Sequence, residues 1–256
     1  MKLLEGKKAL ILGIANKRSI AYGIAKVFKE NGAEIGINYL NEKFEKKLKP
    51  IADELEVSIY HRLDVSSDEQ IEEFFNVVKE KWGEVDIIVH SIAYANKEYL
   101  KGYYYTVDRS SFLQAMDISV YSFTALARKF LPILNEGGSL LTLSYYGAEK
   151  VVYNYNVMGV AKAALEASVK YLARDLGEIK KVRVNAISAG PIKTLAASGI
   201  DQFSAIQKEA EKKAPLKRSV TIEEVGKSAL FLCSSLGDGI TGEVLHVDAG
   251  YHVIGM

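Results

Sequence analysis

Short runs of apolar residues alternate along the chain with longer segments in which apolar residues recur every three or four positions. The short runs predict strands at residues 8–14, 34–39, 57–65, 85–93, 138–145, 182–188 and 242–250. The longer segments predict helices at residues 19–32, 41–55, 68–82, 110–134, 154–176 and 221–235. Residues 190–214 are expected to be mobile. Continuous apolar strands separated by helices indicate a parallel sheet that is covered on both faces.

The order of these elements favours an α/β fold with a doubly wound, Rossmann-type parallel sheet of about seven strands and helices on both faces. The 256 residues contain no linker rich in Pro, Gly or Ser and no repeat, and the four prolines are not clustered. We therefore expect a single domain over residues 1–256. Proteins of this type usually bind a dinucleotide at the carboxyl ends of their strands.

The composition does not suggest several classes of partner. A net charge of +1 gives no reason to expect nucleic acid or a membrane surface. The N-terminal stretch MKLLEGKKALILGI carries charges before a short apolar run, which is typical of neither a secretion signal nor a membrane span. The single cysteine, Cys233, excludes an intrachain disulfide and fits a reducing, cytoplasmic location. The four histidines show no metal-ligand spacing, so no metal site is expected.

The first strand–helix turn reads GIANKRSIAYGIA and lacks the common GxGxxG pattern. Gly13 is expected to make the tight turn, and Ser19 to cap the helix and donate its hydroxyl to a phosphate. Gly23 is expected to let this helix pack close to the sheet. An ordinary capped helix after a strand is the alternative interpretation.

Two further strand ends lie at the same predicted edge of the sheet. Asp64, in LDV at residues 63–65, is suited to accept a hydrogen bond from an adenine amino group, or to cap the next helix. The small residues in HSIA, residues 90–93, let a cofactor lie against the backbone. Three such signals at the ends of the first, third and fourth strands favour a dinucleotide site.

The end of the second strand bears on the choice between NADH and NADPH. A 2′-phosphate is usually bound by a basic residue at this position. The chain has Leu40, Asn41 and Glu42 there, so we expect NADH. The nearby Lys43, Lys46 and Lys47 leave NADPH as the less favoured alternative.

Tyr155 and Lys162 are seven residues apart on a predicted helix, close to two turns, and therefore share a face. An ammonium beside a phenol is expected to lower the pKa of the tyrosine. The lysine can also hold the hydroxyls of a nicotinamide ribose, and the tyrosine can donate a proton or stabilise an oxyanion. An amphipathic helix with a surface lysine is the alternative.

These motifs together resemble the short-chain dehydrogenase/reductase superfamily and, within it, the NADH-dependent enoyl-[acyl-carrier-protein] reductases of the FabI type. The resemblance spans essentially the whole chain. It is carried in order by LLEGKKALILGIANKRSIAYGIA, DIIVHSIAYA, LTLSYYGAE, YNYNVMGVAKAALEA, VRVNAISAGPIKTLAASGI, TIEEVGKSALFLCS and ITGEVLHVDAGY.

One contrast within the superfamily points to the chemistry. Ketoreductases carry Tyr-x3-Lys with a serine thirteen residues before the tyrosine, but this chain has Met158 and Tyr145 at those positions. The enoyl-reductase pattern, Tyr-x6-Lys with a second tyrosine, matches Tyr155, Lys162 and Tyr145. Hydride adds to the β-carbon of an enoyl thioester while charge develops on the more distant thioester oxygen. Moving the tyrosine by about one helical turn provides that displacement.

The resemblance implies catalytic roles for Tyr145, Tyr155 and Lys162. The cofactor contacts that it implies are Gly13, Ser19, Ile20, Asp64, Val65, Ile92, Lys162, Ile192, Thr194 and Ala196. The acyl pocket that it implies includes Ala95, Leu100, Met158, Ile200 and Phe203. It further implies a substrate-binding lid around residues 192–214, an acyl carrier protein as the partner that carries the enoyl thioester, and a homotetramer.

A few positions depart from the family's pattern. Ala93 and Tyr94 stand where Gly-Phe is common, Leu40 replaces a glutamine, and Tyr153 stands where proline is common. Two other functions remain as alternatives. A superfamily reductase acting on another carbonyl or enone is disfavoured by the missing Tyr-x3-Lys. A nucleotide-sensing module without turnover is disfavoured by the intact Tyr155 and Lys162.

Overall fold

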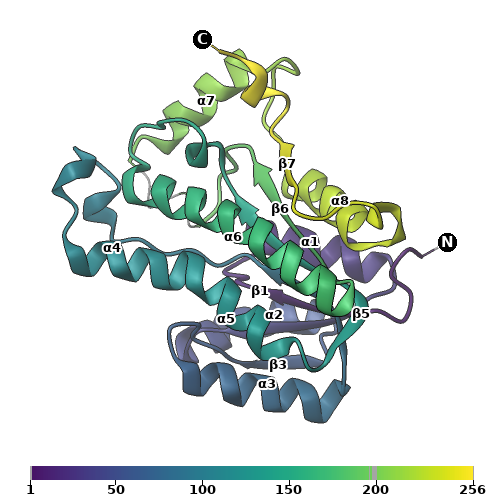
Figure 1. Ribbon diagram of the computed structural model, residues 1–256. Coiled ribbons are helices and arrows are strands. Elements are labelled where there is room, and N and C mark those ends of the chain that lie inside the picture. Colours follow the sequence, from purple (N-terminus) through teal and green to yellow (C-terminus); the bar gives the residue numbers. More distant parts are fainter. Residues whose placement is uncertain (1, 196, 198–200, 256) are drawn as a thin grey trace.

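The computed structural model describes residues 2–195, 197 and 201–255. These residues form one seven-stranded sheet of order β3-β2-β1-β4-β5-β6-β7, in which neighbouring strands all pair in parallel. The strands are β1 (Lys8–Leu12), β2 (Glu34–Tyr39), β3 (Ile59–Arg62), β4 (Val85–His90), β5 (Leu134–Ser144), β6 (Arg183–Ala189) and β7 (Val244–Val247). The predicted doubly wound parallel sheet is therefore confirmed (Figure 1).

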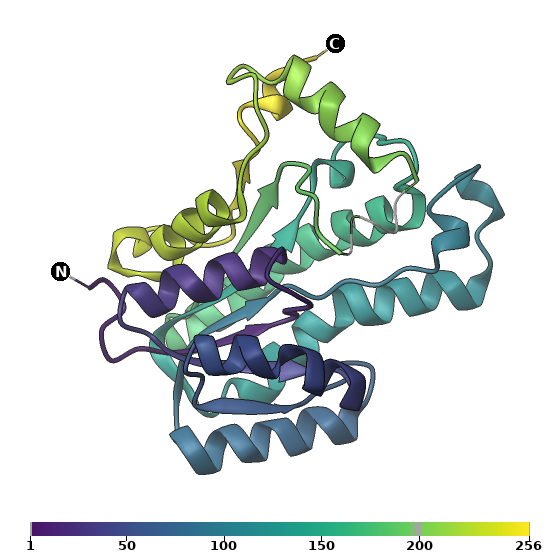
Figure 2. The ribbon, with the colours of Figure 1, turned by 180° about the vertical axis from the view of Figure 1, so that it is seen from behind.

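The helices cover both faces of this sheet. They are α1 (Ile20–Glu30), α2 (Glu42–Glu54), α3 (Asp68–Trp82), α4 (Arg109–Met116), α5 (Ser122–Phe130), α6 (Asn156–Lys180), α7 (Phe203–Lys213) and α8 (Ile222–Cys233). Helices α3 to α6 lie on one face, and α1, α2 and α8 lie on the other (Figures 1 and 2).

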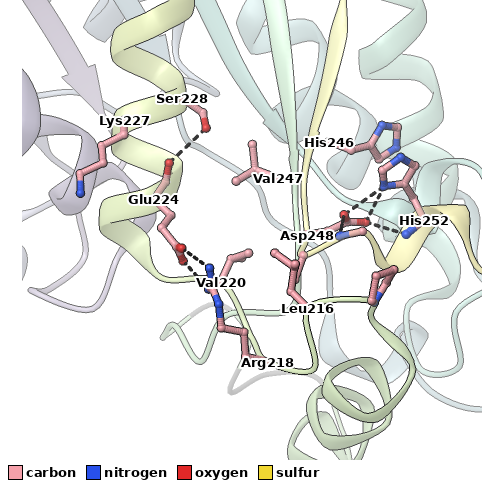
Figure 3. A pocket seen from close by; sticks show the side chains of 13 residues that line it. Leu216, Arg218, Val220, Glu224, Lys227, Ser228, His246, Val247, Asp248 and His252 are labelled. Atoms are coloured by element: carbon pink, nitrogen blue, oxygen red, sulfur yellow. Dashed lines mark hydrogen bonds and ion pairs between the residues drawn. The ribbon is translucent and has the colours of Figure 1, made fainter.

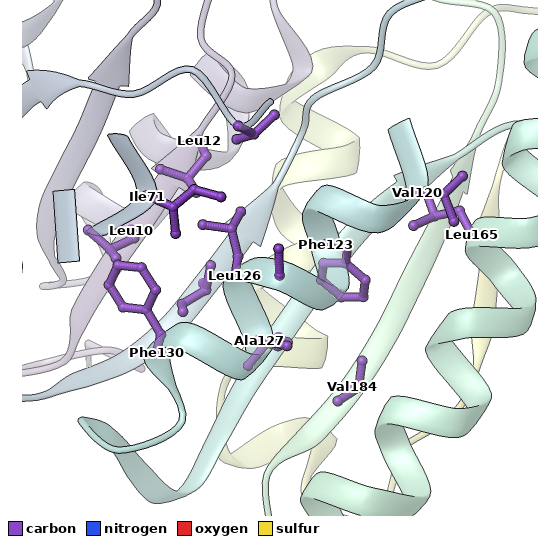
Figure 4. Packing of buried hydrophobic residues seen from close by; sticks show 14 of the residues in the cluster. Leu10, Leu12, Ile71, Val120, Phe123, Leu126, Ala127, Phe130, Leu165 and Val184 are labelled. Atoms are coloured by element: carbon purple, nitrogen blue, oxygen red, sulfur yellow. The ribbon is translucent and has the colours of Figure 1, made fainter. Parts of the chain in front are cut away.

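Two hydrophobic cores follow from the two-residue period of the strands. Leu10 and Leu12 of β1 point into the core under α3 to α6, where Phe123 and Leu165 are fully buried (Figure 4). Ala9 and Ile11, which alternate with them, point into the core under α1, α2 and α8. Because both faces of β1 are buried, its sequence is a continuous apolar run.

The strand order places a topological switch point between β1 and β4. The chain continues outward from β1 to β2 and β3 on one side, and from β4 to β5, β6 and β7 on the other. Crevices outside the carboxyl ends of such strands are where ligands bind in open α/β sheets. The predicted nucleotide residues that follow β1 and β4 therefore lie at the position the topology favours.

Several predicted boundaries are wrong. The helix expected over residues 110–134 is instead α4, a π-helical turn (Asp117–Tyr121) and α5, which ends at Phe130. Pro132 lacks the N–H that a continuing helix needs, and its ring clashes with the preceding helical turn. The helix therefore ends before it, and β5 begins at Leu134. The strand expected over residues 57–65 is only the four-residue β3.

The ends of one predicted helix also differ, and one segment for which no helix was predicted contains one. Helix α6 begins at Asn156, so Tyr155 is its N-cap residue. It runs past the predicted end at residue 176 and ends at Lys180, where the next residue, Lys181, adopts a left-handed conformation (φ 53°). The segment expected to be mobile, residues 190–214, contains the eleven-residue helix α7. Within the described residues, no helix is both long enough and apolar enough to cross a membrane.

Candidate active site

Tyr155 is held at the start of α6 in a buried pocket. The residue is 8% exposed, and its ring packs edge-on against the Tyr145 ring, with centroids 4.9 Å apart and an interplanar angle of 70°. Its carbonyl accepts the first helical hydrogen bonds, from the N–H groups of Met158 (2.9 Å) and Gly159 (3.2 Å). The two tyrosines of the predicted catalytic set are therefore in direct contact.

Two glycines make room for the Tyr155 ring. A Cβ atom at Gly147 would lie 2.4 Å from Tyr155 Cδ1, and one at Gly159 would lie 2.8 Å from the Gly147 carbonyl oxygen. The turn that carries Gly147 can therefore lie directly over the ring only because neither residue has a side chain. Neither Gly147 nor Gly159 was among the predicted site residues, although the SYYGAE and NVMGVAK stretches contain them.

The expectation that Lys162 lowers the pKa of Tyr155 is wrong. Burial raises the pKa of Tyr155 well above its usual value, and Tyr145 and Glu166 raise it further. The pKa of Tyr145 rises to about 12, mainly because of burial and then because of Tyr251. Both phenols are therefore neutral at pH 7, so each can donate a hydrogen bond to an oxygen that gains negative charge.

Lys162 is buried beside the end of β5. Its ammonium donates a 2.6 Å hydrogen bond to the carbonyl oxygen of Leu143, and the residue is 6% exposed. Burial lowers the pKa of Lys162 to about 8, and the carboxyl group of Glu166 opposes that shift. An ammonium carries three donors. The Leu143 carbonyl takes one of them, and the other two suit ribose hydroxyls.

The predicted acyl-pocket residues largely come together. Leu100 and Met158 are buried in the same cluster as Tyr155, and Ala95 packs against that cluster together with Tyr145. Phe203 starts α7, is half-buried and is not part of this cluster. Ile200, predicted for the pocket, and Ala196, predicted for the cofactor, lie outside the described residues.

The turn after β1 has the tight geometry expected of Gly13. Its φ is +97°, and a Cβ atom there would lie 2.1 Å from the carbonyl oxygen of Ser91, which follows β4. The Gly13 N–H donates to Asn38 Oδ1 (2.9 Å), and the Asn38 amide donates to the Leu63 carbonyl (3.2 Å). Asn38 thus joins the turns after β1 and β3. Asn38 was not among the predicted site residues, although a polar residue inside the apolar strand EIGINY was a usable signal.

Ser19 does not cap α1 with its side chain as expected. It occupies the N-cap position, but its Oγ accepts hydrogen bonds from the N–H groups of Ala15 (3.0 Å) and Asn16 (3.1 Å). The hydroxyl therefore shapes the loop before the helix, and the first N–H groups of α1, beginning at Ile20, are not bound by it. Such N–H groups form a favourable site for a phosphate.

Gly23 also differs from its expected role. A Cβ atom there would lie 2.4 Å from the backbone oxygen of Ile222, and one at Gly226 would lie 2.8 Å from the Gly23 carbonyl oxygen. Gly23 therefore allows α1 to approach α8 and not the sheet.

The remaining residues predicted to bind the cofactor lie at the same edge of the sheet. Asp64 follows β3 and accepts hydrogen bonds from the N–H and the hydroxyl of Ser66 (3.0 and 2.7 Å), while Ser67 caps α3. Asp64 is therefore not the cap of this helix. Val65 is buried, and Ile92 Cγ1 would lie 3.1 Å from a Cβ atom at Gly13. The structure thus brings the turns after β1 and β4 into contact.

The loop after β6 is ordered by Thr194. Its N–H donates to the Ile192 carbonyl (2.8 Å), and its hydroxyl accepts from the N–H of Ala197 (3.1 Å). Ile192 packs against the core under α1 and α8. These contacts fix the start of the segment predicted to be a lid.

His90, at the end of β4, is a structural residue. Its ring nitrogens lie 2.9 Å from the hydroxyls of Thr142 and Ser122, and the residue is 1% exposed. Burial and the charge of Lys162 lower the pKa of His90 to about 3, so the ring is neutral at pH 7. The histidine therefore links β4 to β5 and α5.

A separate cavity of about 540 Å³ lies between α8, β7 and the C-terminal segment (Figure 3). Its charged groups are paired within the chain. Arg218 contacts both carboxylate oxygens of Glu224 (2.6 and 2.9 Å), and Asp248 accepts from the N–H of His252 (2.8 Å). Of the predicted site residues that the structure describes, none lines this cavity.

Comparison with known proteins identifies the family of the chain. A protein-family model described as Enoyl-(Acyl carrier protein) reductase matches residues 13–252. The chain is 56% identical over 254 residues to "Enoyl-[acyl-carrier-protein] reductase [NADH] 1" of Rhizobium meliloti, which covers 99% of this chain and 93% of that relative. It is 52% identical over 257 residues to the corresponding FabI enzyme of Aquifex aeolicus, with coverage of 100% and 95%.

Solved structures give the same result. The enoyl-[acyl-carrier-protein] reductase of Anaplasma phagocytophilum in complex with NAD has a TM-score of 0.96 and 53% identity, and covers 99% of this chain and 97% of its own. The Bacillus cereus enzyme with NADP+ and an indole naphthyridinone has a TM-score of 0.97 and 49% identity over 100% of both chains. On these grounds, the chain belongs to the enoyl-[acyl-carrier-protein] reductase family.

Proposed function

We propose that this protein is an NADH-dependent enoyl-[acyl-carrier-protein] reductase that reduces trans-2-enoyl thioesters to saturated acyl thioesters in the last step of fatty-acid elongation. The observation that carries the proposal is the position of Tyr155. It stands seven residues before Lys162, buried against Tyr145, while Met158 occupies the place of the ketoreductase tyrosine. The names of the relatives support the same activity.

Bound NADH supplies the hydride for this reaction. The switch point between β1 and β4 and the close approach of Gly13 to Ser91 suit a dinucleotide that crosses this edge. Lys162 holds the nicotinamide ribose through the two donors that the Leu143 carbonyl does not take. Asn41, after β2, caps α2 by accepting from the Phe44 N–H, and no basic side chain occupies this strand end, which favours NADH over NADPH.

The protein's part in the chemical step is to stabilise the enolate. The neutral phenol of Tyr155 donates a hydrogen bond to the thioester oxygen as negative charge develops there, and then supplies a proton. Its burial keeps water away, which strengthens that hydrogen bond. Tyr145, in edge contact with Tyr155, orients the thioester.

The acyl chain lies on the apolar surface made by Ala95, Leu100 and Met158 beside the two tyrosines. Residues 192–214 close over it as a lid, in which Phe203 stands at the start of α7. In this proposal Ser19, Ile20, Asp64, Val65, Ile92, Ile192 and Thr194 complete the cofactor site.

The natural partner is an acyl carrier protein that delivers the enoyl thioester, and the protein works as a homotetramer in the cytoplasm. Large apolar side chains exposed on α4 and α6, namely Leu113, Tyr171 and Ile179, support self-association through these helices. The free thiol of the buried Cys233 suits a reducing compartment. A molar mass in solution equal to that of the monomer would contradict the tetramer.

A Tyr155→Phe variant tests the proposed role of this phenol. Removing one oxyanion donor should lower kcat by about 10²-fold while the affinity for NADH stays unchanged. Tyr153→Phe is the matched control, because Tyr153 is 85% exposed and lies two residues away. Steady-state kinetics give kcat for both variants, and titration with NADH gives their affinity for the cofactor. Unchanged reduction by Tyr155→Phe would contradict the assignment.

A further inference from the structure

Leu143 and Ser144, which end β5, and Tyr145, which follows it, are each contacted by a residue of α6 or by its N-cap residue. Lys162 donates to the carbonyl of Leu143, and the Tyr155 ring packs against Tyr145. Between them, the hydroxyl of Ser144 donates to the carboxylate of Glu166. The first and third contacts belong to the catalytic residues, whereas the Ser144–Glu166 contact has no role in the mechanism described above.

The spacing of these residues places them on one side of the helix. Lys162 follows Tyr155 by seven residues and Glu166 follows Lys162 by four, which corresponds to about two turns and one turn. Glu166 therefore lies directly beyond the lysine on the face that meets β5. A partly buried acid at such a position requires a polar partner, and the buried Ser144 provides it.

Charged and titratable groups surround this pair from several elements. Lys162 faces His90 of β4, and Glu166 faces Glu149, which follows the turn after β5, and His246 of β7. His90 is neutral, and Glu149 is itself bound to the His246 ring at 2.6 Å. Tyr145 and Tyr155 are neutral phenols. The carboxyl group of Glu166 therefore supplies the negative charge that acts on the buried lysine.

We propose that Glu166 is a positioning residue for this reductase, which fixes the end of β5 through Ser144 and keeps Lys162 in its ammonium form. The proposal rests on the role assigned above to Lys162 in holding the ribose of NADH. Only the ammonium form has donors both for the Leu143 carbonyl and for two ribose hydroxyls. A neutral amine would hold the cofactor less well.

The electrostatic consequence has a definite sign. Burial already lowers the pKa of Lys162 to about 8, and the carboxylate of Glu166 raises it. Without that carboxylate, the lysine loses its proton at a lower pH. The pKa of Glu166 is itself raised. Burial and the charge of Glu149 raise it, and they outweigh Ser144, His246 and Lys162, which lower it.

The test compares the pH dependence of kcat/KM for NADH in wild type and in Glu166→Gln. Glutamine keeps the size of the side chain and an oxygen that accepts from Ser144, so the fold should be retained. The wild-type value should fall as the pH rises through about 8, and this fall should move down by roughly one pH unit in Glu166→Gln. Glu178→Gln is the matched control, because Glu178 lies on the same helix with its side chain 75% exposed.

Two further variants complete the test. Glu166→Asp separates the charge of Glu166 from its contact with Ser144, and Lys162→Met tests separately whether the lysine holds the cofactor. Glu166→Asp keeps the negative charge, so the pH dependence of kcat/KM should match that of wild type. Its side chain is one methylene too short to reach Ser144, so kcat should fall. A Glu166→Gln profile that superimposes on wild type, or a Glu166→Asp profile displaced as far as that of Glu166→Gln, would overturn the inference. Unchanged NADH affinity in Lys162→Met would instead refute the proposed role of the lysine.

Discussion

The fit of Tyr155 under Gly147 predicts the effect of adding one methyl group. Gly147 lies in a short 3-10 turn (Tyr146–Ala148) and does not have a positive φ, so alanine meets no backbone strain there. The added Cβ would lie 2.4 and 2.8 Å from two carbons of the Tyr155 ring and 3.3 Å from the Tyr145 ring. Gly147→Ala therefore perturbs the position of the Tyr155 phenol, the proposed proton donor, without changing any functional group.

The magnitude follows from these distances. Carbon atoms pack best at about 3.5–4.0 Å, so the Tyr155 ring or the turn must move by about 1 Å. A displacement of about 1 Å at a reacting centre can lower the rate by roughly 10²-fold. This corresponds to about 2.7 kcal/mol in the activation barrier. The same overpacking should lower the free energy of unfolding by about 1–3 kcal/mol.

The assay is steady-state reduction of a trans-2-enoyl thioester, together with the thermal unfolding midpoint of the same preparation. Gly239→Ala is the matched control, because a Cβ at Gly239 meets no described atom within 4 Å and its φ is not positive. We expect kcat to fall for Gly147→Ala and to stay unchanged for Gly239→Ala. Wild-type kcat and stability in Gly147→Ala would refute the packing argument.

Two further predictions concern Lys162 and Asn156. The pKa of Lys162 falls from 10.5 in the unfolded chain to about 8 in the folded protein. Between these two pH values the unfolded chain binds one more proton than the folded protein, so the free energy of unfolding rises with pH. The buried ammonium therefore destabilises the fold at neutral pH, and this destabilisation disappears as the pH rises from about 8 towards 10.5. Lys162→Met should therefore gain Tm relative to wild type most strongly near pH 7; a gain that did not shrink at high pH would contradict this. The amide of Asn156 donates to the carbonyls of Lys101 and Gly102 (3.2 and 3.1 Å), so Asn156→Asp should loosen the segment that carries Leu100. At about 1 kcal/mol for exposed hydrogen bonds, KM for the thioester should rise about fivefold with KM for NADH unchanged; an unaltered thioester KM would argue against this role.

The sequence predicted the sheet because its strands are buried on both faces. Such strands read as continuous apolar runs, and parallel pairing follows from the helices between them. The helix expected over residues 110–134 was wrong at its end because Pro132 stops it, and the π-helical turn inside it keeps the apolar pattern of an α-helix. Periodicity alone therefore could not separate α4 from α5.

The residues proposed as the catalytic set, Tyr145, Tyr155 and Lys162, lie close together in the sequence, so their spacing could be recognised without the structure. Their environment could not, since it depends on contacts between distant segments. The pKa of Tyr155 is controlled by burial under Gly147 and Tyr145, and not by the charge of Lys162 that spacing suggested. Asn38 and the Ser144–Glu166 pair act across strands and helices that meet only in the folded chain. Ser19 was misjudged because its hydroxyl binds the loop before the helix.

The most direct test of the central claim is the oxidation of NADH with two classes of thioester. Purified protein is mixed with NADH and with either trans-2-enoyl thioesters, from crotonyl to longer chains, or 3-oxoacyl thioesters. The nicotinamide absorbance is followed, and the same reactions are run with NADPH in parallel. If the displaced Tyr155 directs reduction to the double bond, only the enoyl thioesters will oxidise NADH. Turnover of the 3-oxoacyl thioesters instead would contradict the account, because a group other than Tyr155 would then have to donate the proton beside the reduced carbonyl.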